Sequence, residues 1–169
     1  MSDIKVKYPA TSTVAITCDV SSLASSQTAG RASTAVDNTA TLDLDHLVSG
    51  KITLGTTPTV NKPVSVYAYA PLSIAAGVPT YPDGITGTDA AKTMTSFNVL
   101  SAGLRLLWTG FTDATTGRVL YMPPCSIAQA FGGMPPFWGI FVTQESAVAL
   151  DATAGNHGFQ YERVAAQTV

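Results

Sequence analysis

The chain has 169 residues, of which only 12% are charged and 46% are hydrophobic, and its formal net charge is −2. This length fits one domain that buries about 70% of its unfolded surface, so a stable core requires neither disulfides nor metals. The nine Lys and Arg residues are scattered singly, which excludes the basic patch of a nucleic-acid-binding protein.

The sequence predicts no membrane partner. Its first residues, MSDIKVKYP, lack the apolar core of a signal peptide, so we expect a protein made and kept in a cytoplasm. Residues 119–144 carry no charge, but tandem prolines at 123–124 and 135–136 divide them into pieces too short to cross a bilayer. Cys18 and Cys125 match no metal or redox spacing and are expected to be small buried hydrophobic residues, although one long-range bridge between them remains open.

The N-terminal part of the chain predicts an arm and one strand. Residues 1–12 combine charges, Tyr8-Pro9 and small polar residues, so we predict an arm followed by a single domain over residues 13–169. Apolar and polar residues alternate along residues 13–20, which is the period of a half-buried strand. Residues 21–38 are mostly Ser, Ala, Thr and Gly and predict a flexible surface loop.

The second predicted strand begins where Leu42 and Leu44 alternate with Asp43 and Asp45, and the alternation resumes after Gly50. This pattern predicts leucines toward the core, aspartates toward water and a bulge at the glycine. Two carboxylates on one face would suit a hard cation, but the solvated face of an amphipathic strand is the favoured interpretation.

The middle of the chain continues the strand pattern. Residues 63–70 predict a third strand, which Pro71 ends. The sequence Tyr-Pro-Asp-Gly at 81–84 is a turn signal, because proline presets φ and glycine accepts a positive φ. Residues 93–108 predict two strand pieces with Leu104, Leu106 and Trp108 facing inward, and residues 118–122 predict another strand.

The stretch from Phe131 to Val142, FGGMPPFWGIFV, organises the rest of the prediction. Ser126 caps one helical turn that Gly132 ends, and the tandem prolines then impose an extended entry into a strand over residues 137–142. This strand is apolar on both faces and is therefore expected at the centre of a sheet. A last strand is expected over residues 159–164.

Together these segments predict an all-β protein, an antiparallel β-sandwich of about eight strands with little helix and a jelly-roll-like arrangement. The loops are rich in Gly, Pro and Ser, and no helices lie between strands as a parallel sheet would need. The residues expected in the core are Ile16, Val66, Leu106, Trp108, Trp138 and Ile140.

Residues that carry chemistry are few. Any catalytic histidine must be His46 or His157, and the latter lies in a GNHG sequence typical of a hairpin turn. Cys125 has no cation near it in sequence to activate the thiol. The aspartates at 83, 89, 113 and 151 stand beside Gly or Thr in predicted turns. We therefore predict no catalytic, cofactor-binding or metal site.

Several motifs occur in a familiar order: KYP at 7–9, PVSVYAYA at 63–70, YPDG at 81–84, AFGGMPPFWG at 130–139 and GNH at 155–157. In this combination the chain resembles small structural proteins from the virion gene blocks of tailed bacteriophages, most of all their jelly-roll capsid decoration, or cement, proteins. The resemblance implies a non-enzymatic virion protein on the capsid surface, made in the host bacterial cytoplasm, which binds the major capsid protein.

The low charge also predicts a homo-oligomer, a dimer or trimer. An alternative is a tail or baseplate module that binds a receptor or carbohydrate, with Tyr67, Tyr69, Tyr81, Trp108 and Trp138 exposed as a stacking surface. A degenerate hydrolase sandwich is a further alternative and would need a carboxylate pair or a histidine in a pocket. The interface candidates are Tyr8, Pro9, Phe131, Gly132, Gly133, Pro135, Pro136, Phe137 and Trp138.

Overall fold

The computed structural model describes residues 4–9 and 13–168, which form antiparallel sheets with 47% strand and 11% helix. The predicted all-β sandwich with little helix is confirmed. Within the described residues, no helix is both long and apolar enough to cross a membrane.

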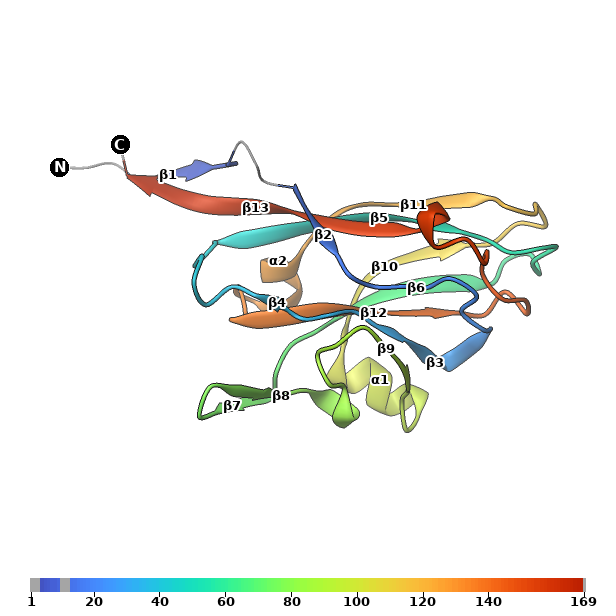
Figure 1. Cartoon of the computed structure of the whole chain (residues 1–169), viewed down its shortest axis with the longest axis horizontal. Coiled ribbons are helices and arrows are strands. Elements are labelled where there is room, and N and C mark those ends of the chain that lie inside the picture. Colours follow the sequence, from blue (N-terminus) through green and yellow to red (C-terminus); the bar gives the residue numbers. More distant parts are fainter. Residues whose placement is uncertain (1–3, 10–12, 169) are drawn as a thin grey trace.

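Two sheets pack face to face (Figure 1). The first sheet contains, in spatial order, β2 (Thr13–Ile16), β13 (Gly158–Thr168), β5 (Asp45–Thr53) and β11 (Val119–Ser126), and β1 (Ile4–Lys7) pairs with the far end of β13. The second sheet contains β10 (Arg105–Phe111), β6 (Pro63–Tyr69), β12 (Phe137–Gln144), β3 (Ser26–Ala32) and β9 (Ala90–Thr93), and the short β4 (Val36–Asp37) also pairs with β12.

Eight of these strands form a jelly roll. The spatial orders β2-β13-β5-β11 and β3-β12-β6-β10 place consecutive strands in opposite sheets, except for β6 and β10, which are neighbours in one sheet. This is the connectivity of two Greek keys wrapped into a sandwich. The focal strand β12 lies at the centre of its sheet, between β6 and β3, as predicted.

The main core fills the space between the sheets. Trp138, Ile140 and Val142 project from β12 into this core, where all three are fully buried. Ile16 from β2 and Val66 from β6 are buried in the same cluster, which confirms their predicted positions. The period-two pattern therefore identified the inward face of the central strands.

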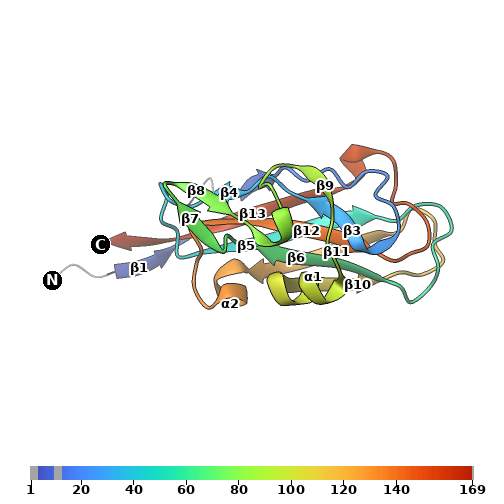
Figure 2. The ribbon, with the colours of Figure 1, turned by 90° about the horizontal axis from the view of Figure 1, so that it is seen from below.

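A second apolar cluster covers the outer face of the second sheet. Tyr67, Tyr69 and Phe141 project from that face and pack under Leu100 of α1 (Phe97–Gly103) and residues near η1 (Pro82–Gly84). Figure 2 shows α1 and the hairpin of β7 (Ser73–Ala75) and β8 (Val78–Thr80) lying over this sheet. As a result, β12 is buried on both faces.

The predicted loop over residues 21–38 is wrong, because this segment contains β3 and β4. Its small residues concealed the strand from a search for alternating hydrophobic residues. They serve close packing instead: a Cβ atom added to Gly30 would lie 2.6 Å from Cζ of Phe141. A strand that lies beneath an aromatic ring needs small residues, which provide no hydrophobic signal.

Residues 93–108 also differ from the prediction of two strand pieces, since α1 occupies Phe97–Gly103 before β10 begins. The Ser96 hydroxyl accepts a hydrogen bond from the Val99 N–H and caps this helix. Leu106 is 57% exposed and Trp108 only half-buried, because a register shift between them interrupts the alternation along β10. Their predicted place in the core is therefore wrong for Leu106 and holds only in part for Trp108.

Two smaller expectations had different outcomes. The helical turn after Ser126 is confirmed as α2 (Ile127–Phe131), and Gly132 ends it with φ of 74°. The expected bulge at Gly50 is wrong, because β5 runs through this residue and the irregularity lies in β11, between Met122 and Cys125.

Candidate functional site

The predicted interface residues fall into two separate parts of the molecule. Tyr8 and Pro9 belong to the connection that follows β1, and Tyr8 is exposed. The others form one continuous connection from α2 into β12: Phe131, Pro135 and Phe137 are half-buried, Gly132, Gly133 and Pro136 are exposed, and Trp138 is fully buried. Trp138 therefore belongs to the core and is not available to a partner.

A buried polar cluster joins Trp138 to His46, Asp43 and Arg163. The Trp138 indole N–H donates to Nδ1 of His46 over 2.9 Å, and Nε2 of His46 lies 3.0 Å from Oδ2 of Asp43. The Arg163 guanidinium reaches the same carboxylate with Nε 2.7 Å from Oδ2. The rings of His46 and Tyr161 also contact each other in a tilted arrangement, with their centroids 4.4 Å apart.

The structure reverses the orientation predicted for residues 42–45. Asp43 is buried, whereas Leu42 and Leu44 are exposed. The reason is that β5 begins only at Asp45 and Leu42 has a positive φ of 49°, so Asp43 lies in a turn where strand alternation does not apply. The Asn38 side chain fixes this turn by accepting from the Asp43 N–H and donating to its carbonyl.

The cluster fixes the protonation state of its histidine. An indole N–H is a donor only, so Nδ1 of His46 must accept, and Nε2 carries the proton that it donates to Asp43. Burial lowers the pKa of His46, and the Asp43 carboxylate only partly opposes this shift. Burial raises the pKa of Asp43. The hydrogen bonds from Arg163 and His46 lower this pKa by more than burial raises it, so it lies below its ordinary value.

This cluster has the components of a structural network. Both ring nitrogens of His46 are occupied by partners, so neither is free to take a proton from a substrate. Asp45, next to it, accepts from the Ser126 hydroxyl and from the Ala128 N–H and so holds α2 against β5. No buried polar side-chain atom in the described part of the chain lacks a hydrogen-bond partner.

The other histidine and the cysteines are also held in the framework. His157 accepts from the Thr53 N–H at Nδ1 over 3.3 Å, and its Nε2 lies 2.9 Å from the Asp151 carbonyl oxygen. Cys18 and Cys125 are free thiols, and burial raises the pKa of each. A raised pKa keeps a thiol protonated and weakens it as a nucleophile.

Two of the four aspartates that were predicted to lie in turns stabilise turns of their own. Asp113 and Asp151 accept backbone N–H bonds from residues two positions later, which is the local turn geometry predicted for them. Asp83 instead bonds Thr95, and Asp89 forms an ion pair with Arg31 at 2.5 Å. Among residues 4–9 and 13–168, no three His, Cys, Asp or Glu side chains are grouped in a way that could hold a metal ion.

The aromatic residues considered as a sugar-binding surface are placed elsewhere. Tyr67, Tyr69 and Tyr81 are buried beneath α1, and the Tyr69 hydroxyl donates to the Ser33 carbonyl over 2.6 Å. Trp138 lies in the main core and Trp108 is half-buried. These five residues therefore do not form an exposed stacking surface.

Exposed apolar side chains and an open strand edge occur together in the terminal ribbon, which we define as residues 4–7 of β1 and residues 165–168 of β13. The two segments pair from Ile4↔Thr168 to Lys7↔Ala165, beyond the point where β13 leaves β5. Figure 1 shows this ribbon projecting from one end of the sandwich. Ile4 is 77% and Val6 64% exposed. Residues 1–3 and 10–12 of the predicted arm lie outside the described residues.

The two faces of the terminal ribbon differ. Because side chains alternate along a strand, Ile4 and Val6 share one face with Ala166, and Lys5 and Lys7 share the other. The edge of β1 away from β13 has no ladder partner among the described residues. The ribbon thus offers an apolar stripe, two cations and a row of backbone groups to another chain. None of the family models, curated proteins or solved structures compared with this chain matches it.

Proposed function

We propose that this protein is a non-enzymatic viral structural protein, a capsid decoration protein that binds the outside of a tailed-phage head and stabilises it. The observation that carries the proposal is the terminal ribbon, which exposes apolar side chains and an open strand edge at one end of a rigid sandwich. Jelly rolls recur in capsid and lectin domains, which supports a virion role by analogy of fold.

The ribbon supplies a chemically plausible means of attachment. A two-stranded ribbon is only marginally stable in water, so covering Ile4 and Val6 would stabilise both the ribbon and the complex. The open edge of β1 can extend a strand pairing into the major capsid protein. Lys5 and Lys7 discourage unselective edge-to-edge pairing and favour an acidic surface on the partner.

The rest of the sandwich provides rigidity. A decoration protein that contacts two capsid subunits at once gains from the effective concentration of the second contact, provided that its body does not bend. The main core and the polar cluster around His46 connect both sheets and provide this rigid body. Copies of the chain would associate with one another on the head as a dimer or trimer.

The test adds purified protein to undecorated heads of the same virion and measures sedimentation with the heads and their heat resistance. Full-length protein should bind and raise the temperature of head disruption, and Ile4→Asp/Val6→Asp should bind at least tenfold more weakly. The matched control is Leu72→Asp/Val78→Asp, since these residues are 73% and 66% exposed near the β7–β8 hairpin.

Each outcome bears on a different part of the proposal. Equal binding of the Ile4→Asp/Val6→Asp variant would remove the terminal ribbon from the attachment. If full-length protein failed to bind heads but purified with tails, the cement role would be overturned in favour of a tail component. Sedimentation of the free protein at micromolar concentration tests the homo-oligomer separately.

A further inference from the structure

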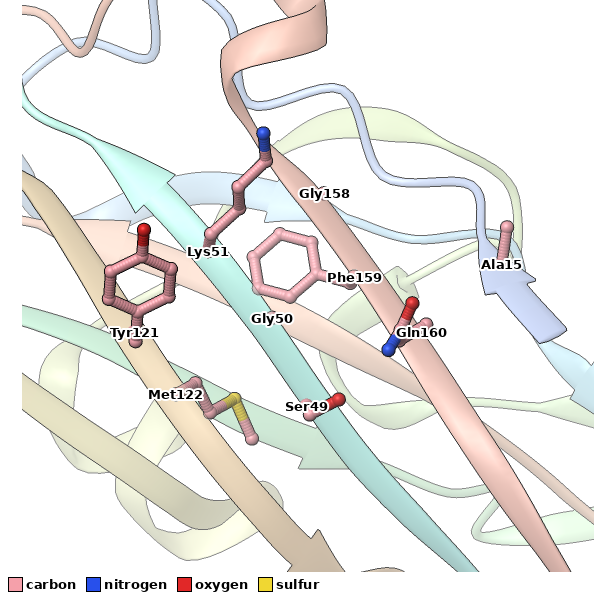
Figure 3. A pocket seen from close by; sticks show the side chains of 9 residues that line it. All are labelled: Ala15, Ser49, Gly50, Lys51, Tyr121, Met122, Gly158, Phe159 and Gln160. Carbon is pink, nitrogen blue, oxygen red and sulfur yellow. The ribbon is translucent and has the colours of Figure 1, made fainter. Parts of the chain in front are cut away.

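The outer face of the first sheet has a shallow depression of about 410 Å³ where β11, β5 and β13 run side by side (Figure 3). Two rows of register partners cross it. Tyr121, Lys51 and Gly158 form one row across the three strands. Ser49, Gln160 and Ala15 form the next row, across β5, β13 and β2.

The first observation that points to a ligand is Gly158. It is the first residue of β13 and has no positive φ, and a Cβ atom added there would meet nothing within 4 Å. Neither packing nor backbone conformation requires glycine here, although glycine weakens a strand. Its neighbour Gly50 is different, because an added Cβ would lie 2.5 Å from Cδ1 of Phe159. A glycine that opens a depression leaves room for a ligand to approach the backbone closely.

The second observation is Tyr121. It is 72% exposed, in contrast to the tyrosines at 67, 69 and 81, which are buried. Its ring stands at one end of the first row, with the small Gly158 at the other end and Lys51 between them (Figure 3). An exposed aromatic ring beside an open strand surface offers one apolar face to a flat ligand.

The polar groups around the ring define the ligand class. The Lys51 ammonium donates to the Gly155 carbonyl over 3.2 Å, which positions it beside the depression and leaves two of its three donors for other partners. Gln160 and Ser49 add an amide and a hydroxyl, each of which both donates and accepts. A ring with an apolar C–H face and hydroxyls around its edge matches this combination of one aromatic and several mixed polar groups.

We propose that this depression binds a saccharide, with the sugar ring stacked on Tyr121 above Gly158 and its hydroxyls bonded to Lys51, Gln160 and Ser49. The site lies at the start of β13, and the terminal ribbon lies at its other end. Seven residue steps separate Gly158 from Ala165, where the ribbon begins, which is about 23 Å along a strand. A chain attached to a shell through the ribbon would therefore hold this site away from the shell, where it can meet a glycan.

The test screens full-length protein on an array of hexose, N-acetylhexosamine and sialic-acid oligosaccharides, and then titrates the strongest binder by calorimetry. Tyr121→Ala and Gly158→Leu should each weaken binding at least tenfold, the first by removing the stacking ring and the second by filling the depression. Tyr121→Phe keeps the ring and should lose less than about fivefold. Tyr8→Ala, which removes another exposed tyrosine, should bind like the unmodified protein.

The urea midpoint of each variant establishes that its fold is intact, because none of these side chains is required by the core. The proposal is overturned if no array member binds, or if Tyr121→Ala and Gly158→Leu bind as tightly as the unmodified protein. It is also overturned if Tyr121→Ala changes the sedimentation of the free protein and not its sugar affinity, since the depression would then be a contact between copies. Head binding is a separate measurement and can succeed or fail independently.

Discussion

The two outer faces of the sandwich are built in opposite ways. The face formed by β6, β12 and β3 lies beneath α1 and the β7–β8 hairpin (Figure 2) and buries three tyrosines. The face formed by β13, β5 and β11 has no such layer in the described part of the chain and exposes Tyr121 beside small and polar residues. The long excursion between β6 and β10 makes this difference, since it folds back over one sheet only.

This comparison indicates where binding is possible. Aromatic residues on the covered face contribute to stability, as the bonded hydroxyl of Tyr69 illustrates. An aromatic residue on the bare face contributes little to the core and is available to a ligand. Substitutions on the covered face and in the core beneath it should therefore change folding, whereas those on the bare face and the ribbon should change binding.

Trp138→Ala should have the largest effect on stability. Truncating a fully buried tryptophan costs about 3–5 kcal/mol, and here it also leaves Nδ1 of His46 without its donor. Urea unfolding followed by circular dichroism measures the loss. Tyr121→Ala, on the bare face, should change the free energy of unfolding by less than about 0.5 kcal/mol. A loss below about 1 kcal/mol for Trp138→Ala would contradict the central position of this side chain.

A pair of glycines compares the two outer faces directly. A Cβ atom at Gly139 would overlap the Tyr69 ring on the covered face, so Gly139→Ala should cost about 1–3 kcal/mol. Gly158→Ala meets open space on the bare face and should be neutral or stabilising by up to about 1 kcal/mol. The two unfolding free energies provide the measurement, and equal losses would show that both faces are packed alike.

The sequence was sufficient to predict the sandwich, but it did not predict the helix that covers one outer face or the strand β3 beneath it. Alternation along β6 and the prolines before β12 identified the central strands, because each depends on residues close together in the chain. α1 was missed because Ser96 and the seven residues after it show no clear helical period. β3 was missed because its close packing under Phe141 requires small residues.

The polar cluster could not be predicted, because its partners are distant in sequence. The Leu-Asp alternation at 42–45 indicated solvated aspartates. Asp43 is buried because Arg163, 120 residues away, neutralises it, and His46 is buried with the indole of Trp138, 92 residues away. The exposed Tyr121 also gave no signal of its own, since the strand containing it was predicted without its orientation.

The buried histidine predicts a pH dependence. The pKa of His46 is lowered in the folded protein, whereas the unfolded chain titrates near its ordinary value of about 6.5. Below that pH the unfolded state binds one more proton, so the free energy of unfolding should fall as pH falls, by at most about 1.4 kcal/mol per unit. Among the charged groups that surround the His46 ring, Asp43 and Asp45 favour protonation of the ring and Arg163 opposes it.

Urea unfolding between pH 8 and pH 5 measures this slope. His46→Gln should flatten it, although the variant itself is less stable. A slope that is unchanged in His46→Gln would assign the dependence to other groups.

The smallest of these effects concerns α1, which covers the outer face of the second sheet. Ser96 caps α1 by accepting the Val99 N–H over 3.2 Å, so Ser96→Ala should cost about 1 kcal/mol. The matched control is Ser101→Ala in the same helix: Ser101 is exposed and bonds only the Asn98 carbonyl, and alanine suits a helix interior better than serine. Hydrogen exchange should become faster over residues 97–103 in the first variant alone. Neither variant should alter binding to heads or sugars, because α1 covers the face opposite to the depression. A loss of binding in Ser96→Ala with an intact first sheet would mean that the cover takes part in recognition, and the contrast between the two faces would have to be abandoned.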